Sequence, residues 1–399
     1  MRILLFKRAN ICYGVVNYCS EQIALQLKKH DISCDFLDIT AGESIIASEL
    51  QRLVTTNKYD AALAINAIGQ EAYQADGQNL YDALGIPFYN LLLDHPTAHL
   101  SDLIEVSKDY HAICIDRDHV EFINRHLPHI RGAHFIPLGG IEEGYNSISF
   151  DDYIGRKYDI IFCGENKNLD RIEEHIMALD DNARNIIIDE IELFLSNREL
   201  SLDTILDQIL NDRGISPASA KDYLSYAQTM VIAQQYCSAF LREEIIRYIA
   251  ASGRPMHIFG KGWESIISEE GGQITLHNEV SFSDTAGLYR NSRFVLNIMP
   301  LFRNGCHDRI PTALLNGAAA FTDPTAYLKE IFQAGHGIYY YDISHPESIP
   351  DTLDAVISDP AAAFENLSDG ITIAREKLSW PGFTDSFIKL LYDHTANKT

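Results

Sequence analysis

The sequence predicts an α/β protein with two doubly wound parallel sheets, the second of which is interrupted by a helical insertion. The chain has 399 residues, more than the roughly 100–200 that one domain usually takes. Short, continuously apolar segments alternate with amphipathic segments in both halves of the chain, which is typical of parallel strands covered by helices on both faces. Between residues 165 and 250 the strand signals disappear and only helical periodicity remains.

We expect a first domain over residues 1–150, which alternates between strands and helices along its length. The apolar runs predict strands at residues 3–6, 34–37, 61–66, 88–93, 111–115 and 133–136. The intervening amphipathic stretches predict helices at residues 18–30, 48–55, 80–84, 102–106 and 120–125.

The glycine-rich stretch 139–155 reads as a linker, and we expect a second α/β domain over residues 151–385. Its predicted strands are residues 158–163, 256–260, 274–280, 294–298, 318–322 and 337–341. Between the later strands, helices are expected at residues 283–290, 310–316 and 326–334. The helical insertion would occupy residues 165–250, and residues 386–399 would form a C-terminal tail.

Composition and net charge disfavour several classes of binding partner and indicate the compartment of the protein. The formal net charge of -24 disfavours a nucleic-acid-binding surface and an anionic membrane surface. No segment approaches the roughly 20 apolar residues of a membrane span, and residues 3–6 are too short for a signal peptide. The seven cysteines include no C-x-x-C pair, which suggests buried thiols in a reducing compartment. We therefore expect a cytoplasmic protein.

A polar loop that follows the strand at 294–298 is the most informative segment for function. It contains Asn304, Gly305, His307, Asp308 and Arg309, immediately before a predicted helix. The first N–H groups of a helix and a forked guanidinium are both suited to a diphosphate. A purely structural interpretation is that Asp308 caps the helix and that Arg309 pairs with a carboxylate.

The same region resembles a known family. Leu296-Asn297, His307-Asp308-Arg309, Asn316-Gly317 and Thr322-Asp323 occur in the order found in the donor-binding half of GT-B glycosyltransferases. The likeness is greatest to the bacterial group related to spore-maturation glycosyltransferases. The turn Ile258-Phe259-Gly260-Lys261-Gly262-Trp263 resembles an earlier turn of the same domain.

The resemblance implies a GT-B architecture, a nucleoside diphosphate sugar (a UDP-sugar above all) as donor, retention of anomeric configuration, and neither a cofactor nor a metal. Gly260 and Lys261 would lie near the donor, and Val280 and Ser281 would border the base. Many members have Glu near the ribose where this chain has Thr312. A hydroxyl bonds a ribose less strongly than a carboxylate does, so a degenerate, non-catalytic member stays open as an alternative.

In the first domain, loops after the strands supply the acceptor-side candidates. These are Tyr13, Asn66 and the pair Asp94-His95, which follows a strongly apolar strand and precedes a rigid proline. Asp94 and His95 are the candidate acid-base residues. The alternative is that His95 and His99 cap or solvate a helix start; as a metal pair they lack a third ligand.

The sequence therefore predicts transfer of a hexose or N-acetylhexosamine to a carbohydrate or protein acceptor. Two alternatives remain, namely a sugar-nucleotide epimerase and a non-catalytic binding partner with the same fold. The helical insertion would offer a surface for a partner protein or for self-association.

Overall fold

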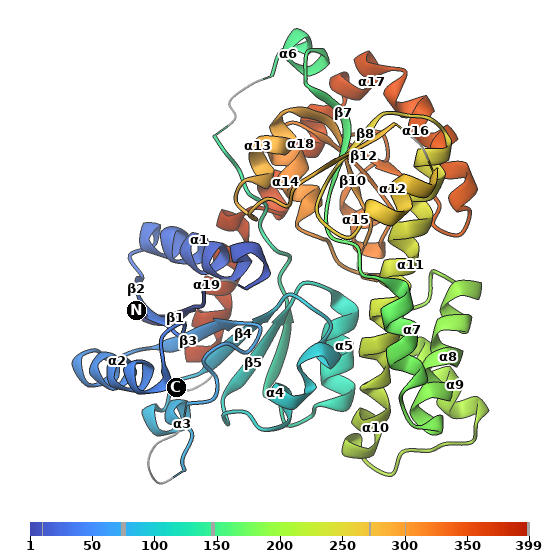
Figure 1. Cartoon of the computed structure of the whole chain (residues 1–399). Helices are drawn as coiled ribbons and strands as arrows, with labels where there is room; N and C mark the ends of the chain where they lie inside the picture. Colours follow the sequence, from blue (N-terminus) through green and yellow to red (C-terminus); the bar gives the residue numbers. More distant parts are fainter. Residues whose placement is uncertain (10, 73–76, 145–147, 271–272, 300, 397–399) are drawn as a thin grey trace. The chain divides into compact units, whose positions relative to one another are not determined.

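The computed structural model describes all residues except 10, 73–76, 145–147, 271–272, 300 and 397–399 (Figure 1). The chain divides into two compact units. Unit 1 comprises residues 1–138 and 380–399, and unit 2 comprises residues 139–379. The division at residue 138 precedes the expected one at 150, and the segment from residue 380 belongs with unit 1 instead of closing the second domain. The last three residues of the expected tail lie outside the described residues.

Unit 1 contains a six-stranded, all-parallel sheet in the order β2-β1-β3-β4-β5-β6. The strands are β1 (Arg2–Lys7), β2 (Ser33–Asp38), β3 (Ala61–Ile65), β4 (Phe88–Leu92), β5 (Tyr110–Cys114) and β6 (Gly132–Phe135). The helices are α1 (Val15–Lys29), α2 (Glu43–Thr56), α3 (Leu80–Leu84), α4 (Leu100–Ile104), α5 (Arg117–His126) and α19 (Trp380–Ala396), with short 3-10 turns η1 (Cys12–Gly14) and η2 (Pro96–His99). Every residue of β3, β4 and β5 is buried, as the continuous apolar runs predict.

The last helix, α19, is part of unit 1 because its apolar side packs on that unit. It contacts α1, and Trp380 meets Tyr18 edge to face at 6.2 Å between ring centroids. Phe387 meets the buried ring of Tyr89 at 5.3 Å. Sequence periodicity alone does not specify which sheet a helix covers, because an apolar stripe can pack on any apolar surface.

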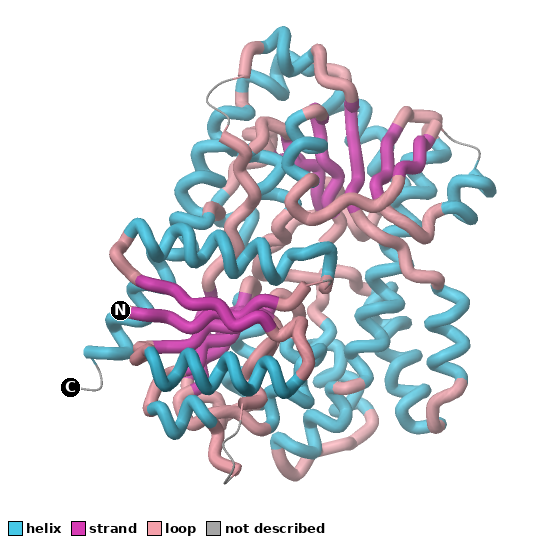
Figure 2. The backbone as a smooth tube through the Cα atoms, turned by 60° about the vertical axis from the view of Figure 1, so that its left-hand side comes forward, coloured by secondary structure: helices cyan, strands magenta, loops and turns pink. Residues whose placement is uncertain are grey.

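Unit 2 contains a second parallel sheet, whose strands are magenta in Figure 2. It has six strands in the order β12-β11-β10-β7-β8-β9. The strands are β7 (Tyr158–Cys163), β8 (Met256–Phe259), β9 (Ile274–His277), β10 (Ser292–Asn297), β11 (Ala319–Thr322) and β12 (Ile338–Tyr340). Helices around the sheet are α6 (Phe150–Ile154), α12 (Glu264–Glu270), α13 (Thr285–Arg290), α14 (Arg309–Leu315), α15 (Ala326–Ile331), α16 (Ile349–Ile357), α17 (Pro360–Glu365) and α18 (Leu367–Lys377), with the 3-10 turn η3 (Pro346–Ser348). Two parallel six-stranded sheets with helices confirm the predicted fold class.

The expected insertion is a group of helices between β7 and β8 (Figure 1). They are α7 (Leu169–Met177), α8 (Asp181–Ser196), α9 (Leu202–Asp212), α10 (Ala220–Ala227) and α11 (Thr229–Ala251). The long helix α11 packs on α8 within the insertion and on α12 and α16 beside the sheet. The insertion is therefore anchored to the sheet by one continuous helix.

A buried carboxyl in this insertion makes stability depend on pH. Glu190 is 0% exposed; its Oε1 accepts a hydrogen bond from Thr229, and its Oε2 has no hydrogen-bond partner among the described residues. Burial raises the pKa of Glu190 from its usual value of 4.5 to about 8. Between these values the folded state binds more protons than the unfolded state, so this group's contribution to stability falls as pH rises through that window.

We expect Glu190→Gln, which mimics the protonated side chain, to abolish this dependence. Relative to wild type, the variant should gain roughly 2–4 kcal/mol in free energy of unfolding between pH 5 and pH 9. Urea unfolding of both proteins at the two pH values measures the difference. An equal pH dependence in both proteins would show that Glu190 is not protonated in the fold.

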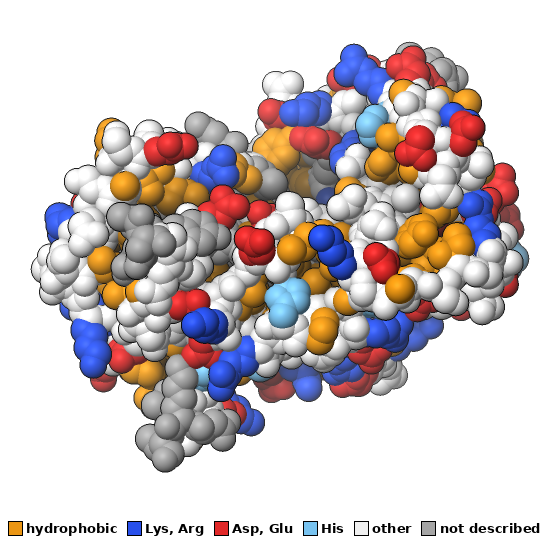
Figure 3. All heavy atoms as spheres, turned by 90° about the horizontal axis from the view of Figure 1, so that it is seen from below, with side chains coloured by type: hydrophobic (Ala, Val, Ile, Leu, Met, Phe, Trp, Pro, Cys, Tyr) orange, Lys and Arg blue, Asp and Glu red, His pale blue; other side chains and the backbone are white. Residues whose placement is uncertain are grey.

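Charged side chains of both signs are mixed on the surface of the protein. On the face drawn in Figure 3, Lys and Arg side chains are interspersed with acidic ones. Within the described part of the chain, no helix combines the length and apolarity needed to cross a membrane.

Candidate active site

The sheet of unit 2 has a topological switch point between β7 and β10. From β7 the chain proceeds to β8 and β9 on one side, and β10 then returns to pair with β7 on the other. Loops that leave the carboxyl ends of β7 and β10 diverge at this point, which is where doubly wound sheets bind ligands. The loop 164–166 follows β7, and the loop 298–308 joins β10 to α14.

Glycines bring the loops after β7 and β8 into contact. The Gly164 N–H donates to the Phe259 carbonyl at 3.0 Å, and the Asn166 N–H donates to the Lys261 carbonyl at 3.0 Å. A Cβ on Gly260 would lie 2.1 Å from the Gly164 oxygen, and one on Gly262 would lie 2.3 Å from the Asn166 oxygen. Both glycines are therefore required by loop packing, whatever they do for a ligand.

Trp263 completes this packing. Its side chain is 0% exposed, and its indole N–H donates to the Gly164 carbonyl at 2.9 Å. Its ring meets Phe162 edge to face at 5.7 Å. The turn after β8 is thus a rigid support for the loop after β7.

Arg309 is the central side chain at the switch point. It begins α14 and is only 9% exposed, and its Nε donates to the Cys163 carbonyl at 2.7 Å. Nη1 donates to Asn297 Oδ1 at 3.2 Å, and the guanidinium lies over the Phe162 ring at 5.1 Å. The side chain thereby bridges the carboxyl ends of β7 and β10.

The structural interpretation of Arg309 required a carboxylate partner. Among the described residues, its hydrogen bonds go to neutral oxygens, and Nη2 makes none. A Cβ on Gly164 would lie 3.0 Å from Nη2, so a glycine there leaves room beside this nitrogen. No carboxylate of the described residues forms an ion pair with Arg309, although the buried Asp308 interacts with its charge. An anion bound at Nη2 would give this guanidinium a direct acidic partner.

Two further basic groups lie close enough to Arg309 to affect its field. Arg242, on α11, donates to the Glu165 carbonyl at 2.9 Å; burial and the charge of Arg309 lower the pKa of Arg242 to about 10. Burial, Arg309 and Arg242 together lower the pKa of His307 well below its usual value. Arg309 and Arg242 therefore bring two positive charges close together, whereas the lowered pKa leaves His307 neutral at pH 7.

The start of α14 differs from the expected helix-end anion site. His307 satisfies the first amides, because its Nδ1 accepts from the Arg309 N–H at 3.3 Å and its carbonyl accepts from the Ile310 N–H at 3.1 Å. Asp308 makes no capping hydrogen bond; its Oδ1 lies 3.1 Å from His307 Nδ1. The arginine side chain, and not the helix end, is thus the group available to an anion.

Other predicted donor residues have mixed placements. Lys261 is exposed and lies 3.0 Å from Glu279 and 3.4 Å from Glu165. Val280 packs against the core of unit 2, and Ser281 accepts from the Asp284 N–H at 3.3 Å. Asn304 and Gly305 lie in the loop between β10 and α14, and the Gly305 carbonyl accepts from Thr325 at 2.7 Å.

Thr312 is the clearest departure from expectation. Its side chain is 1% exposed, and its hydroxyl accepts a hydrogen bond from the Ile141 N–H at 3.1 Å. Asn316 donates to the Ile141 carbonyl at 2.8 Å on the same face of α14. Thr312 thus fastens the segment after residue 139 to α14 and is not available to a ribose.

Unit 1 brings two of its predicted residues together. Asn66 Nδ2 donates to Asp94 Oδ2 at 3.0 Å, and His99 Nε2 lies 3.7 Å from the same oxygen. Burial raises the pKa of Asp94, but bonds and charge from His99 and Asn66 outweigh it, so the pKa lies below its usual value. Asp94 is therefore ionised at neutral pH, and its side chain is 57% exposed.

His95 and Tyr13 are placed differently. His95 Nδ1 accepts from the Thr97 N–H at 3.2 Å and caps η2, which is the structural alternative for this residue. Tyr13 lies in η1 with φ 57° and is 41% exposed, directly before Gly14 at φ 86°.

A groove of about 1060 Å³ lies beside Asn66 in unit 1. Its walls come from α2, from the segments after β1 and β2, and from the loop after β3. In that loop Asn66 and Ala67 both have positive φ, 48° and 61°. Left-handed backbone at non-glycine residues is costly and often marks functional loops.

Sequence reasoning missed Arg242, Asn297 as a partner of Arg309, and Gly164. Arg242 lies in the run Leu241-Arg242-Glu243-Glu244, which reads as an exposed helix face. Its position near Arg309 depends on how α11 returns to the sheet, and no local signal gives this. Gly164 directly follows a predicted strand, so a loop glycine at the switch point was a signal that could have found it.

Comparisons with known proteins agree with this geometry. Residues 241–379 match the family model described as glycosyl transferase-like. No curated protein matches the sequence.

Solved structures share the whole fold at low identity. Sucrose-phosphate synthase from Thermosynechococcus elongatus aligns with a TM-score of 0.60 and 9% identity, over 100% of both chains. Anabaena HepE in complex with UDP and glucose aligns with a TM-score of 0.54 and 11% identity, over 98% of this chain and 100% of that one. A glycosyltransferase from Rickettsia africae gives 0.52 and 9%, over 98% of both. The chain therefore has the GT-B fold seen in these glycosyltransferase structures, and its residues 241–379 match a glycosyl transferase-like family model.

Proposed function

We propose that this protein is a nucleotide-sugar-dependent glycosyltransferase. It transfers a hexose or N-acetylhexosamine from a UDP-sugar to a carbohydrate or protein acceptor, with retention of configuration. The family match over residues 241–379 and the GT-B fold support the reaction class. The UDP and glucose in the HepE structure support the choice of donor.

The observation that carries the proposal is the environment of Arg309. A guanidinium that is 9% exposed and bonded to neutral oxygens stands at the switch point of the sheet. Arg242 and His307 lie within electrostatic reach. A diphosphate supplies the negative charge that this group lacks, and Nη2 is the nitrogen placed to donate to it.

The surrounding loops would bind the rest of the donor. Asn304, Gly305 and His307 precede Arg309 in the loop before α14, and they would contact the donor from there. Val280 and Ser281, after β9, would contact the base, and Lys261 would leave Glu279 to approach a phosphate. Gly260 would keep the packing role described above, against the loop that follows β7.

Catalysis would depend on stabilising the leaving group. The bond between the anomeric carbon and the diphosphate oxygen breaks, and a bond from the acceptor hydroxyl to that carbon forms on the same face of the sugar, as retention of configuration requires. Arg309 would stabilise the negative charge that develops on the departing UDP. The acceptor hydroxyl loses its proton, so a basic group must accept that proton.

Asp94 is the residue that we assign to the acceptor proton. It is exposed, ionised and oriented by Asn66, which itself lines the groove of unit 1. The groove would hold the acceptor, with Tyr13 at the turn that follows β1. His95 keeps the capping role described above.

Asp94→Asn should lower kcat by about 10²–10⁴-fold with little change in the affinity for UDP, as expected for loss of a general base. Asp385→Asn is the matched control, because Asp385 is also exposed and lies 3.4 Å from a histidine, His30. Steady-state kinetics of both variants test the assignment. An unchanged kcat in Asp94→Asn would remove Asp94 from the reaction.

The proposed function is tested by incubating the protein with a panel of nucleoside diphosphate sugars and candidate acceptors. Two results together would support the proposal: chromatography detects release of the nucleotide, and the acceptor gains the mass of one sugar. Conversion of a donor to an isomer without acceptor would identify an epimerase. Binding of donors without turnover on a broad acceptor panel would favour the non-catalytic alternative.

A further inference from the structure

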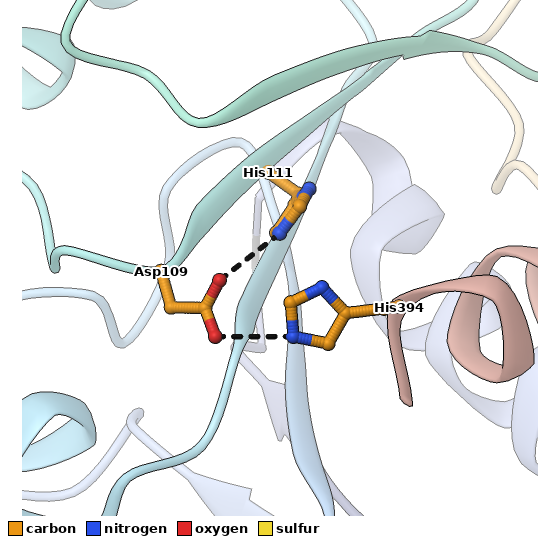
Figure 4. Close-up of side chains that lie close together, drawn as sticks. All are labelled: Asp109, His111 and His394. Carbon is orange, nitrogen blue, oxygen red and sulfur yellow. Dashed lines mark hydrogen bonds and ion pairs between the residues drawn. The ribbon is translucent and has the colours of Figure 1, made fainter. Parts of the chain in front are cut away.

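A cluster of imidazoles and one carboxylate lies at the amino end of β5, the opposite end of the sheet from Asn66 and Asp94. Asp109 precedes β5, His111 lies within it, and His394 comes from α19 (Figure 4). Asp109 Oδ1 lies 3.3 Å from His111 Nε2, and Asp109 Oδ2 lies 3.1 Å from His394 Nε2. Each of these three residues can offer one ligand atom, and these atoms all lie within 4.8 Å of one another.

We propose that Asp109, His111 and His394 bind a divalent transition-metal ion, best matched by Zn²⁺, which fastens α19 to the sheet of unit 1. Two imidazoles and one carboxylate are a ligand set that Zn²⁺ accepts, whereas Mg²⁺ and Ca²⁺ prefer oxygen ligands throughout. Water would take the fourth position.

The surroundings orient the ligands as metal sites do. The three side chains are only 16%, 7% and 10% exposed. The ring of Tyr89 stacks on His111 at 5.0 Å and meets His394 edge to face at 6.5 Å. His111 Nδ1 lies 3.1 Å from His134 Nε2, so the nitrogen that does not face Asp109 also has a partner. Such an outer partner fixes the tautomer of a metal-binding histidine.

A glycine makes this arrangement possible. A Cβ on Gly132 would lie 2.7 Å from His111 Nδ1 and 2.7 Å from His134 Nε2. Any other residue at position 132 would push the two imidazoles apart. The cluster is therefore built by the fold of β5 and β6 and completed by α19.

Two features of the cluster indicate how the three side chains would have to rearrange when a metal ion binds. Ligands at about 2.0–2.2 Å from one ion can be no more than roughly 4.4 Å apart, so the three side chains must move slightly inward. Arg131 lies 3.2 Å from Asp109 Oδ1. The oxygen that faces His394, Oδ2, is therefore the one that we assign to the metal.

The test uses the full-length protein without a histidine tag, stripped with EDTA and titrated with Co²⁺ and then Zn²⁺. We expect visible absorption that saturates at one Co²⁺ per chain and is displaced by Zn²⁺. Zn²⁺ should also raise Tm. His394→Ala should abolish both effects.

Two further variants keep the result interpretable. Asp109→Asn preserves shape, so it tests the site if His394→Ala fails to fold, and it should weaken Co²⁺ binding at least about tenfold. His277→Ala is the matched control, since it removes one histidine from another cross-strand pair, His257–His277, at 2.9 Å. Absence of a saturable site, equal binding by wild type and Asp109→Asn, or loss of binding in His277→Ala would each overturn the proposal.

Discussion

Arg309→Ala should weaken UDP binding by about 1.5–3 kcal/mol, or roughly 10- to 150-fold in Kd. The reason is that Arg309 is 9% exposed, bonded to neutral oxygens, and located where the loops after β7 and β10 diverge. Transfer activity should fall at least as far, because the charge on the leaving diphosphate is greatest in the transition state. Isothermal titration calorimetry with UDP measures the first effect, and steady-state kinetics the second.

Two variants separate the role of Arg309 from a general loss of charge. Arg213→Ala removes an arginine of the insertion that pairs with Asp189, and it should bind UDP as wild type does. Arg309→Lys keeps the charge but loses the forked donor, so it should fall between wild type and Arg309→Ala. Wild-type affinity in Arg309→Ala, with the fold verified by circular dichroism, would exclude Arg309 from the donor site.

Gly262→Ala should destabilise the protein by about 2–4 kcal/mol, because two costs combine. Residue 262 has φ 84°, which a Cβ makes unfavourable. The new Cβ would also lie 2.3 Å from the backbone oxygen of Asn166, and overpacking of this kind typically costs about 1–3 kcal/mol. Since the loop 164–166 borders Arg309, affinity for UDP should fall as well.

Gly287→Ala is the matched control for this prediction. Gly287 lies within α13, and a Cβ there would have no atom of the described residues within 4 Å. Alanine favours a helix over glycine by roughly 1 kcal/mol, so this variant should be as stable as wild type or slightly more so. Urea unfolding of both variants makes the comparison; equal stabilities would contradict the packing of the 260–263 turn on loop 164–166.

The fold was largely predictable because its signals are local. The apolar run of β4, for example, and the helical periodicity of residues 165–250 both identify elements without knowledge of their neighbours. Arg309 could be singled out because a polar loop between a strand and a helix is itself a local pattern.

What sequence could not supply were the long-range contacts. From the sequence, Thr312 is a candidate hydroxyl for ligand binding. In the fold, this hydroxyl instead accepts a hydrogen bond from the Ile141 N–H. From the sequence, Arg242 is part of an exposed helix face. In the fold, α11 returns to the sheet, and Arg242 donates to the carbonyl of Glu165. His394 and Asp109 are separated by 285 positions, so their contact follows only from the packing of α19 on unit 1.

The central claim is that the guanidinium of Arg309 binds the diphosphate of a nucleotide sugar. A crystal structure of the protein with bound UDP tests it most directly. We expect diphosphate oxygens within hydrogen-bond distance of Arg309 Nη2, beside Gly164, with the Cys163 and Asn297 contacts retained. A UDP molecule bound elsewhere, with Arg309 still bonded only to Cys163 and Asn297, would contradict it.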